Sequence, residues 1–539
     1  MNQEKQSAGA NIIVRGTLII IAVSLLSKLL GFSREMVMAY QFGATGVVDA
    51  YIVAYTIPYL FMAIVGPALS TVIVPVYNEY MTAGKREEAC KTFSTLFTIL
   101  GLILVLFTIV GMALPEKIVN LVAPGLPEDT ARLAFTLTLV MLPAMIFLGL
   151  NNLFAGLLNA NNIFGPSAAT PAISSIFIII AAMGRDIWGI QGVAAGTVLG
   201  ILAGAVVLLP FLKKTGFVFR MSLNIRDPGV GKCFKLILPV IIGAGITQIY
   251  IIINRMLASG LPEGSISALN YAYIAVMLPY GLYVNALRTS IFPTLSSHIS
   301  AGRYDEMIRV LERGCKVVSY ITLPILAGFL ILGTPFVQLI YERGAFGQNA
   351  VEMTSAALFF YSFGLLGICI NPLLIRGFHA LQDMRTPVYV GLISVLINVG
   401  LSLLFINSMK HAGLALANSI AINFSMLSLI WFLSRKQERC PSVNRDIIQW
   451  LCLLLGATFI MAVSVALLDR VLAAWLTGAG MNLLSRVMLD IILGAVVFFA
   501  CSRCLRLPEY DYLFDLFAQG LRRIGLDFLA RFFVRRPQD

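Results

Sequence analysis

Charged residues interrupt the first two apolar segments of the chain. Lys28, Arg34 and Glu35 lie at the end of the first segment, and Asp49 opens the second. A charge at the centre of a bilayer costs at least about 2.5 kcal/mol, so it normally faces a cavity or a partner. Two neighbouring cations suit an anion, and a guanidinium binds phosphate through paired donors. The pattern predicts a cationic cavity for an anionic ligand, with Lys28 and Arg34 as ligand-binding residues.

Four further residues belong to this prediction. Arg255 and Arg288 lie in the seventh and eighth apolar segments and are added to the anion-binding set. Glu35 and Asp49 are expected to pair with basic residues or to help close the cavity. Snorkelling to the membrane interface is an alternative for Lys28 and Arg255, and a local pair with Asp49 is the alternative for Arg34.

Motifs of enzymes are missing from the sequence. It has no H-E-x-x-H, no P-loop and no G-x-S-x-G, and its three histidines lie in separate connections. Cys501 and Cys504 form a lone CxxC with no second pair. We therefore expect no catalytic residue, no metal and no cofactor, and a driving force from a Na⁺ or H⁺ gradient or from the membrane potential.

The composition is that of a membrane protein. Of 539 residues, 58% are hydrophobic and 12% are charged, against about 45–50% and about 25% in soluble domains. The net charge of +12 is spread over short loops, which does not indicate a nucleic-acid partner. Apolar segments long enough to span a bilayer lie near 12–32, 48–76, 92–115, 131–158, 168–184, 188–212, 231–254, 266–297, 315–341, 352–379, 386–408, 411–434, 447–468 and 480–502. The sequence predicts an all-α polytopic membrane protein with 14 transmembrane helices.

Basic residues orient these helices. With a cytoplasmic N-terminus, 28 of the 39 basic residues fall on the inner side and 8 on the outer side. Cytoplasmic loops carry such an excess. The first apolar segment lacks a small-residue cleavage site and is interpreted as a retained helix. We expect a multi-pass protein of the cell membrane, monomeric, with both termini in the cytoplasm.

An internal repeat divides the chain. The stretch from Ala68 to Lys85 (Ala-Leu-Ser-Thr, a proline, then Ala-Gly-basic) recurs from Ala286 to Arg303, with the matching residues at a constant offset. Repeats of this kind place a substrate site between two halves. The prediction is two six-helix lobes around a central cavity, residues 1–220 and 221–440. Two extra helices follow at 441–505, and an amphipathic basic tail at 506–539 lies on the inner leaflet.

Several ordered motifs resemble the MurJ/MviN lipid II flippase family. They are Gly31-Phe-Ser-Arg-Glu35, Phe42-Gly-Ala, Asp49-Ala-Tyr, Ile57-Pro58, Leu339-Ile-Tyr-Glu-Arg-Gly-Ala-Phe346 and Arg376-Gly-Phe-His-Ala-Leu-Gln-Asp-Met-Arg-Thr-Pro387. The resemblance runs from about residue 12 to 435. It implies the multidrug/oligosaccharidyl-lipid/polysaccharide exporter fold. The implied activity is transfer of an undecaprenyl-diphosphate-linked peptidoglycan precursor to the outer leaflet by alternating access.

The resemblance also assigns roles to residues. Arg34, and Lys28 in a place often held by arginine, would bind the diphosphate, and Asp49 matches the family's acid at the start of helix 2. Asp383 matches one acid of a sodium site found in some members. The lipid tail would pass along a groove beside helices 13 and 14, among membrane lipids.

Two departures keep other functions open. Met62 and Ile274 stand where some members have arginine, so the cavity is less cationic. A flippase for another lipid-linked sugar, such as a teichoic-acid, capsule or O-antigen unit, is the nearest alternative. An ion-coupled exporter of small molecules would need an acidic cavity, and a membrane scaffold would gain little from charges within its spans.

Overall fold

The structure, a computed structural model, describes residues 2–224, 226–435, 445–479 and 482–523, and all regular elements in these ranges are helices. In a bilayer a helix satisfies its backbone hydrogen bonds internally, which explains why long apolar segments adopt it. The first helices are α1 (Asn2–Phe42), α2 (Gly46–Thr82), α3 (Arg86–Ala113), α4 (Pro115–Val122), α5 (Glu128–Met141), α6 (Ala144–Ala160), α7 (Gly165–Met183), α8 (Arg185–Lys214) and α9 (Pro228–Ser259). The later ones are α10 (Ser265–Pro279), the π-helix η1 (Tyr280–Val284), α11 (Asn285–Ser300), α12 (Tyr304–Tyr341), α13 (Gln348–Ser362), α14 (Leu365–Ala380), α15 (Arg385–Arg435), α16 (Arg445–Ala479), α17 (Leu483–Cys504) and α18 (Pro508–Arg523).

The helices agree with the predicted membrane-spanning segments. Among the described residues, eight helices are long and apolar enough to cross a membrane, or ten if the bent pairs α5–α6 and α13–α14 each count as one span. Each of the fourteen predicted segments falls on a helix or a broken helix, and α15 covers two because it breaks at Lys410 (φ 50°, ψ −132°). The all-α polytopic class is confirmed, while the count of 14 stays a prediction.

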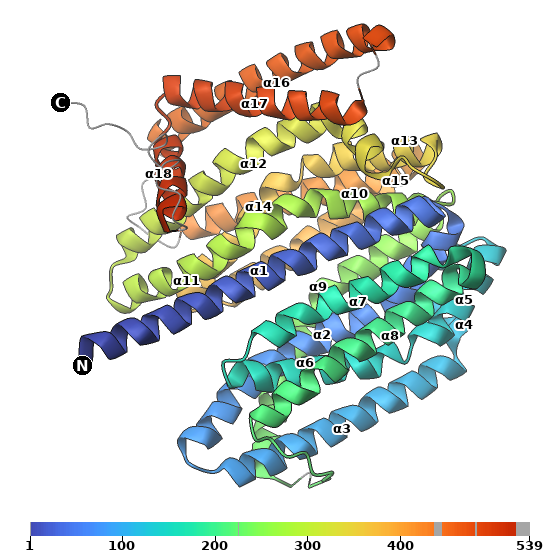
Figure 1. The fold of residues 1–539 in the computed structure, drawn as a ribbon, viewed down its shortest axis with the longest axis vertical. Helices are drawn as coiled ribbons and strands as arrows, with labels where there is room; N and C mark the ends of the chain where they lie inside the picture. Colours follow the sequence, from blue (N-terminus) through green and yellow to red (C-terminus); the bar gives the residue numbers. More distant parts are fainter. Residues whose placement is uncertain (1, 225, 436–444, 480–481, 524–539) are drawn as a thin grey trace. The chain divides into compact units, whose positions relative to one another are not determined.

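The chain forms two compact units. The first unit comprises Met1–Ile274, Tyr341–Met353 and Val399–Leu414, and the second comprises Ala275–Ile340, Thr354–Asn398 and Ala415–Asp539. Within the first unit, α7 packs along α8 and α1, and α2 packs against α5, α6 and α9 (Figure 1). The units do not end where the predicted lobes end, so the lobes at 1–220 and 221–440 remain a prediction.

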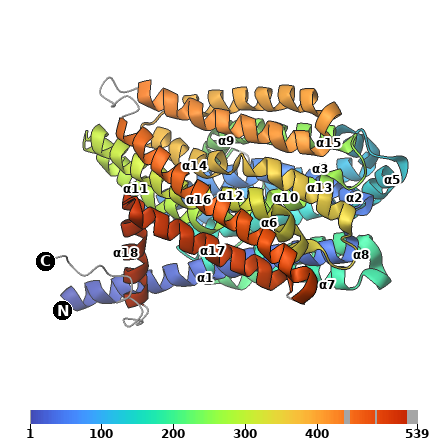
Figure 2. The ribbon, with the colours of Figure 1, turned by 90° about the horizontal axis from the view of Figure 1, so that it is seen from above.

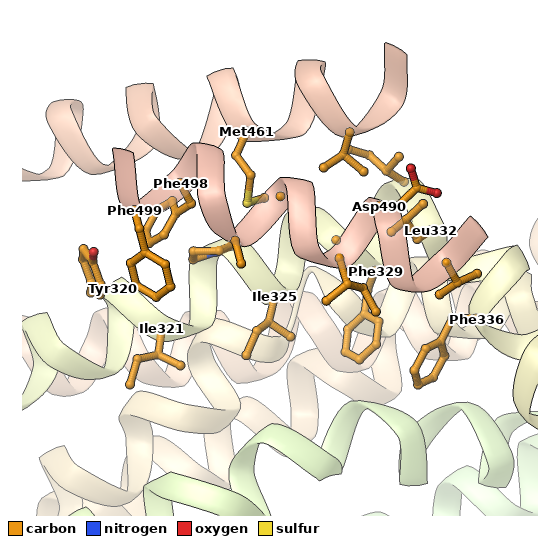
Figure 3. A pocket seen from close by; sticks show the side chains of 18 of the residues that line it. Tyr320, Ile321, Ile325, Phe329, Leu332, Phe336, Met461, Asp490, Phe498 and Phe499 are labelled. Carbon is orange, nitrogen blue, oxygen red and sulfur yellow. The ribbon is translucent and has the colours of Figure 1, made fainter. Parts of the chain in front are cut away.

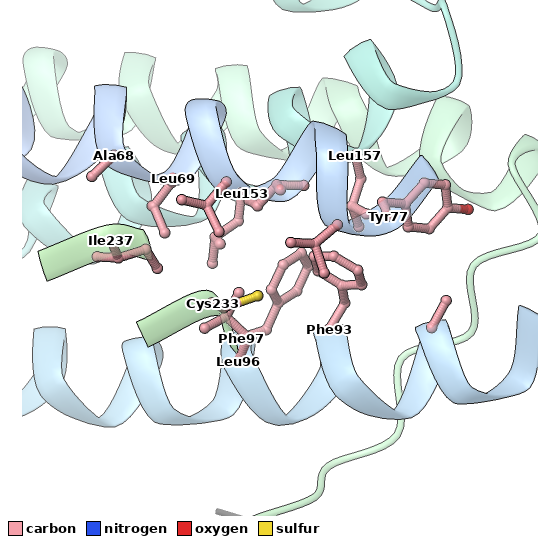
Figure 4. Packing of buried hydrophobic residues seen from close by; sticks show 14 of the residues in the cluster. Ala68, Leu69, Tyr77, Phe93, Leu96, Phe97, Leu153, Leu157, Cys233 and Ile237 are labelled. Carbon is pink, nitrogen blue, oxygen red and sulfur yellow. The ribbon is translucent and has the colours of Figure 1, made fainter. Parts of the chain in front are cut away.

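A dense cluster of side chains fixes α2 within the first unit. Leu69 and Tyr77 of α2 meet Phe93 and Phe97 of α3, and residues of α6 and α9 complete the cluster (Figure 4). The rings of Tyr77 and Phe93 lie 5.5 Å apart in an edge-on arrangement. In lipid, such close packing supplies the attraction between helices. The cluster therefore holds α2, which carries part of the candidate site, in a defined position.

The internal repeat is visible in the backbone. Helices α5 and α6 meet at 43°, and their counterparts in the second half, α13 and α14, meet at 45°. Asn162 and Gln382 share a left-handed conformation with φ of 59°. The breaks in α8 at Gly189 and in α15 at Lys410 occupy equivalent places too. The members of each pair are separated by nearly the same length of chain as the two copies of the repeated sequence.

Hydrogen bonds between helices repeat in the same way. The side-chain amide of Asn151 donates to the carbonyl oxygen of Ile201 at 3.5 Å. The side-chain amide of Asn371 donates to the carbonyl oxygen of Ile422 at 3.1 Å. Each half thus joins the second helix of its bent pair to a later helix through one asparagine, which supports the duplication inferred from the sequence.

The C-terminal helices form a bundle within the second unit. Helices α16 and α17 run side by side (Figures 1 and 2), and α18 contacts α17. The indole nitrogen of Trp450 on α16 donates to a carboxylate oxygen of Glu509 on α18 at 2.8 Å. Tyr510 and Leu513 of α18 pack on an apolar cluster that includes Leu454 of α16 and Phe498 of α17. The start of the predicted surface tail therefore packs on protein, and residues beyond Arg523 lie outside the described ranges.

Candidate functional site

Arg34 and Glu35 form an ion pair on α1 in the first unit. The Nε atom of Arg34 donates to Oε1 of Glu35 at 3.0 Å, and the same oxygen accepts from Nη2. The two side chains are 27% and 12% exposed, so both are largely withdrawn from the surface. The pair takes the place of the Arg34–Asp49 pair that the sequence left as an alternative. Because Glu35 is the ion-pair partner of Arg34, an anionic ligand could replace Glu35 as the hydrogen-bond acceptor of the guanidinium.

A ladder of tyrosines lies beside this pair. Tyr51, Tyr55 and Tyr59 project from α2 at four-residue spacing, with ring centroids 6.3 Å and 5.9 Å apart. Arg34 interacts electrostatically with the hydroxyl groups of Tyr51 and Tyr55. The hydroxyl of Tyr51 also hydrogen-bonds Oγ1 of Thr197 at 2.9 Å. Sequence analysis missed these phenols, although the four-residue spacing within an apolar segment is a signal that could have found them.

Lys28 lies two turns before Arg34 on the same helix. Its side chain is exposed, and six residues correspond to about 9 Å along a helix axis. The preceding residue, Ser27, is buried and donates from Oγ to the carbonyl oxygen of Ala168 on α7 at 2.8 Å. This bond fixes α1 against α7 at the level of Lys28.

Asp49 caps another helix of the first unit. It is 3% exposed, and its two oxygens accept hydrogen bonds from the backbone nitrogens of Gly264 and Ser267, each at 2.7 Å. Gly264 directly precedes α10 and Ser267 lies in its first turn, and a carboxylate at this end also complements the helix dipole. Arg255 of α9 lies close enough to stabilise the charge of Asp49. Asp49 and Ser267 are separated by 218 residues, which is also the offset between the two copies of the repeat, such as Ala68 and Ala286. The hydrogen bond therefore joins equivalent positions at the starts of α2 and α10.

Three glycines seal the end of the first unit around Asp49. Gly43, Gly264 and Gly344 have φ of 69°, 87° and 60°, and a Cβ atom on any of them would lie 2.4 Å from a backbone carbonyl oxygen. The backbone nitrogen of Ala345 also donates to the carbonyl oxygen of Tyr40 at 2.8 Å. Only glycine tolerates both this conformation and this approach. The end is closed by contacts between backbones.

An aromatic cluster underlies the closed end. Tyr271 of α10, Tyr341 and Phe346 have ring centroids between 5.2 and 5.6 Å apart, and all three are at most 1% exposed. Phe346 ends the Leu339–Phe346 motif, and Gly344 within that motif makes the close backbone contact described above. The motif therefore builds the closure.

Two candidate residues belong to the second unit. Arg288 lies on α11, and its Nε atom is buried without a hydrogen-bond partner in the described part of the chain. Asp383 caps α15, since its Oδ1 accepts from the backbone nitrogens of Arg385 and Thr386 at 3.0 Å. Across the described ranges no group of three or more His, Cys, Asp or Glu side chains is arranged to hold a metal ion. Asp383 thus has a local structural role, and a cation site there remains a prediction.

An apolar pocket of about 390 Å³ lies between α12, α16 and α17 in the second unit (Figure 3). Phe329, Phe336, Met461 and Phe498 line it, with the fully buried Asp490 in its wall. Such a lining fits a hydrocarbon chain.

Comparisons with known proteins identify the family of the chain. The model of the family described as "Lipid II flippase MurJ" matches residues 38–485. The chain is 31% identical to the lipid II flippase MurJ of Burkholderia cenocepacia over 83% of this chain and 88% of that protein. The chain belongs to the lipid II flippase MurJ family. The probable lipid II flippase MurJ of Rickettsia prowazekii is 27% identical over 92% of this chain and 98% of its own length.

Solved structures give the same family and its wider fold. A MurJ flippase structure described as an inward closed conformation matches with a TM-score of 0.77 and 27% identity, covering 90% of this chain and 98% of its own. An inward-facing multidrug transporter of the MATE family and MOP superfamily matches with a TM-score of 0.66 and 14% identity, covering 78% of this chain and 99% of its own. The second likeness shows a shared fold between MurJ and MATE proteins.

Proposed function

We propose that the chain flips lipid II, moving undecaprenyl-diphosphate-linked muropeptide from the inner to the outer leaflet by alternating access. The observation that carries this function is the Arg34–Glu35 pair of a MurJ family member, a largely withdrawn guanidinium on α1, which the sequence predicts to span the membrane. Charges are retained at such positions when a ligand or a partner uses them.

The pair suggests how the diphosphate is held. An incoming phosphate would displace Glu35 from Arg34, because a phosphate accepts two parallel hydrogen bonds from a guanidinium. The hydroxyls of Tyr51 and Tyr55 can donate to the same anion. Lys28, about 9 Å along the helix, suits a second charged group of the same ligand. Arg255 would act on Asp49 at the closed end.

The closed end suggests the gate. The cap from Asp49 to α10 and the three glycine contacts must separate before a ligand could leave on that side. With cytoplasmic termini, as the basic residues predict, this end faces outward, and the structure then corresponds to a state open toward the cytoplasm or occluded. A change from this state to one that is open to the outside would carry the headgroup across the membrane.

The apolar pocket beside α16 and α17 suggests where the lipid tail lies. A hydrocarbon chain requires no polar partner, and the lining offers almost none. We propose that the tail stays at this pocket while the headgroup crosses. A Na⁺ or H⁺ gradient or the membrane potential would drive transport by a monomer.

Replacement of a depleted lipid II flippase in growing bacteria tests the proposal. Cells that lose their own flippase lyse, and expression of this chain should restore growth. Restored growth would argue against the alternative function, in which this chain flips a teichoic-acid, capsule or O-antigen unit and not lipid II. Lysis despite insertion of the chain in the membrane would overturn the assignment of lipid II.

A further inference from the structure

The second repeat carries two arginines where the first has small residues. Helices α11 and α14 correspond to α2 and α6 of the first repeat. At equivalent positions, Ser70 is replaced by Arg288 and Gly156 by Arg376. Gly156 belongs to a tight contact, since a Cβ atom there would lie 3.0 Å from Cδ1 of Ile73. The same helix pair in the second repeat has instead gained two positive charges.

These two arginines lie close together, and no acid among the described residues neutralises them. Within the second unit, α11 packs against α14, and the guanidinium of Arg376 lies 5.0 Å from the ring centroid of Phe292 on α11. Arg288 lies near enough to repel Arg376, and the hydroxyl of Tyr280 lies near the same guanidinium. The Nε atom of Arg288 is buried and has no hydrogen-bond partner among the described residues. His379, one turn beyond Arg376, adds a further basic group.

Two positive charges near one another in a partly buried site repel, which costs free energy unless an anion lies between them. A stability role explains neither their proximity nor the unused donor. Guanidinium groups with free donors favour phosphate or carboxylate. The arrangement therefore indicates an anion that bridges the two side chains.

The backbone before Arg288 is also unusual. Tyr280–Val284 forms a π-helix between α10 and α11, whereas α2 runs through the equivalent region as an α-helix. The hydroxyl of Tyr283 hydrogen-bonds Oγ1 of Thr322 on α12 at 2.5 Å, which fixes this turn. Short π segments inside α-helices are frequently found at functional sites. Here the segment lies one turn before Arg288.

The number of residues along each helix gives the expected depth of Arg288 and of Arg34 in the membrane. Arg288 is 23 residues from the start of α10 at Ser265, or about 35 Å at 1.5 Å per residue, slightly more than the hydrocarbon thickness of about 30 Å. Arg34 is eight residues from the end of α1 at Phe42, or about 12 Å. With the orientation predicted from the basic residues, both counts start at the outer side. The pair then lies at the depth of the inner-leaflet headgroups.

We propose that Arg288 and Arg376 form a second anion site, which captures the phosphate groups of the lipid cargo at the inner leaflet before Arg34 binds them. The site rests on the proposed function in its choice of cargo. An anionic phospholipid offers the same phosphate chemistry, and the experiment separates the two sources.

Binding measurements on the full-length protein in phosphatidylcholine nanodiscs test the site. Lipid II and phosphatidylglycerol are added separately, and bound lipid is measured by native mass spectrometry. The Arg288→Gln/Arg376→Gln variant should bind lipid II about ten-fold or more weakly, since it loses the charge-assisted hydrogen bonds of both arginines to phosphate. The Arg288→Lys/Arg376→Lys variant keeps both charges and should bind lipid II more tightly than the double glutamine variant. Arg309→Gln, which removes an exposed arginine of α12, is the matched control and should bind as the wild type does.

The outcomes distinguish this site from the proposed function. Wild-type affinity for lipid II in the double glutamine variant would overturn the site and leave the flippase function standing. Weaker binding of phosphatidylglycerol alone would overturn the capture of cargo. Failure of the wild type to bind lipid II would count against the proposed function itself, and with it this role for the pair. Elution volume and thermal unfolding of each variant show that lost affinity is not lost folding.

Discussion

At the scale of single residues, the Arg34–Glu35 pair is the feature on which transport would depend. Its two members are adjacent in sequence, so the pair forms without help from any other helix and keeps the arginine charged and oriented when no ligand is present. The cost of holding that charge in the membrane is offset by its ion pair with Glu35.

Replacement of Arg34 by alanine should abolish support of growth in cells depleted of their own lipid II flippase. The variant leaves Glu35 without its partner and removes the bidentate donor, and Arg34→Lys should retain partial function because the charge remains. Arg132→Ala, which breaks an exposed pair with Glu128, is the control and should support growth fully. Immunoblotting of membrane fractions must show that each variant is present in the same amount as the wild-type protein. Full growth with Arg34→Ala would refute the diphosphate-binding role.

Asp49 offers a second prediction at this scale. Asp49→Asn keeps the shape of the side chain but weakens the cap on α10 by removing its charge, an effect of about 1 kcal/mol. The closed end should then open more often. Ser265 is fully buried beside the cap, so the accessibility of a cysteine at this position measures how often the closed end opens. Labelling of Ser265→Cys by a membrane-impermeant maleimide, followed by mass spectrometry, should rise several-fold in the Asp49→Asn background, and unchanged labelling would argue against a gating role.

At the scale of elements, the closed end depends on glycines that the helices bring together. Gly344→Ala should impair closure, because its φ of 60° disfavours a side chain and its Cβ would collide with the carbonyl oxygen of Tyr40. Gly347→Ala is the control within the same loop, since a Cβ there meets nothing within 4 Å. Growth should fall with the first variant and not with the second. Equal growth of both would show that this contact does not matter for transport.

The pocket beside α16 and α17 gives a prediction for the lipid tail. Gly328 lines the pocket and has open space at its Cβ, so Gly328→Leu should fill the cavity without disturbing α12. Binding of lipid II with its full tail should weaken several-fold, while an analogue with a short tail should be unaffected. Gly456→Leu adds the same side chain at an open position outside the pocket lining and serves as the control. Equal losses for both tail lengths would contradict a tail site.

Much of the helical framework could be predicted, because continuous apolar segments have few alternatives in a bilayer. The sequence also found the cluster of charges on α1. The residues that contact Asp49 and Arg34 could not be predicted from the sequence. Asp49 reaches the start of α10, 218 residues away, and no local pattern encodes that distance. Tyr51 and its neighbours were missed because tyrosine is common in membrane helices, and only the folded chain shows that Arg34 lies beside them.

At the scale of the whole molecule, the duplication is the organising feature. Bends, left-handed residues and interhelical hydrogen bonds recur at nearly the same offset as the repeated sequence, so each half inherits the same frame. We propose that ligand binding depends on positions where the halves differ. The first repeat has small residues at the positions of Arg288 and Arg376, whereas α1 carries Lys28 and Arg34. A common frame with different charges allows a ligand to be captured and then transferred.

The central claim is that this chain moves lipid II across a bilayer, and reconstitution tests it most directly. Fluorescent lipid II is placed in both leaflets of vesicles that contain the purified chain, and a membrane-impermeant quencher then reports how fast the inner pool becomes accessible. The account predicts rapid loss of the protected pool with the wild type, and with Arg34→Ala a rate equal to that of protein-free vesicles. A protected pool that persists with the folded wild-type protein, under an imposed ion gradient or membrane potential, would contradict it.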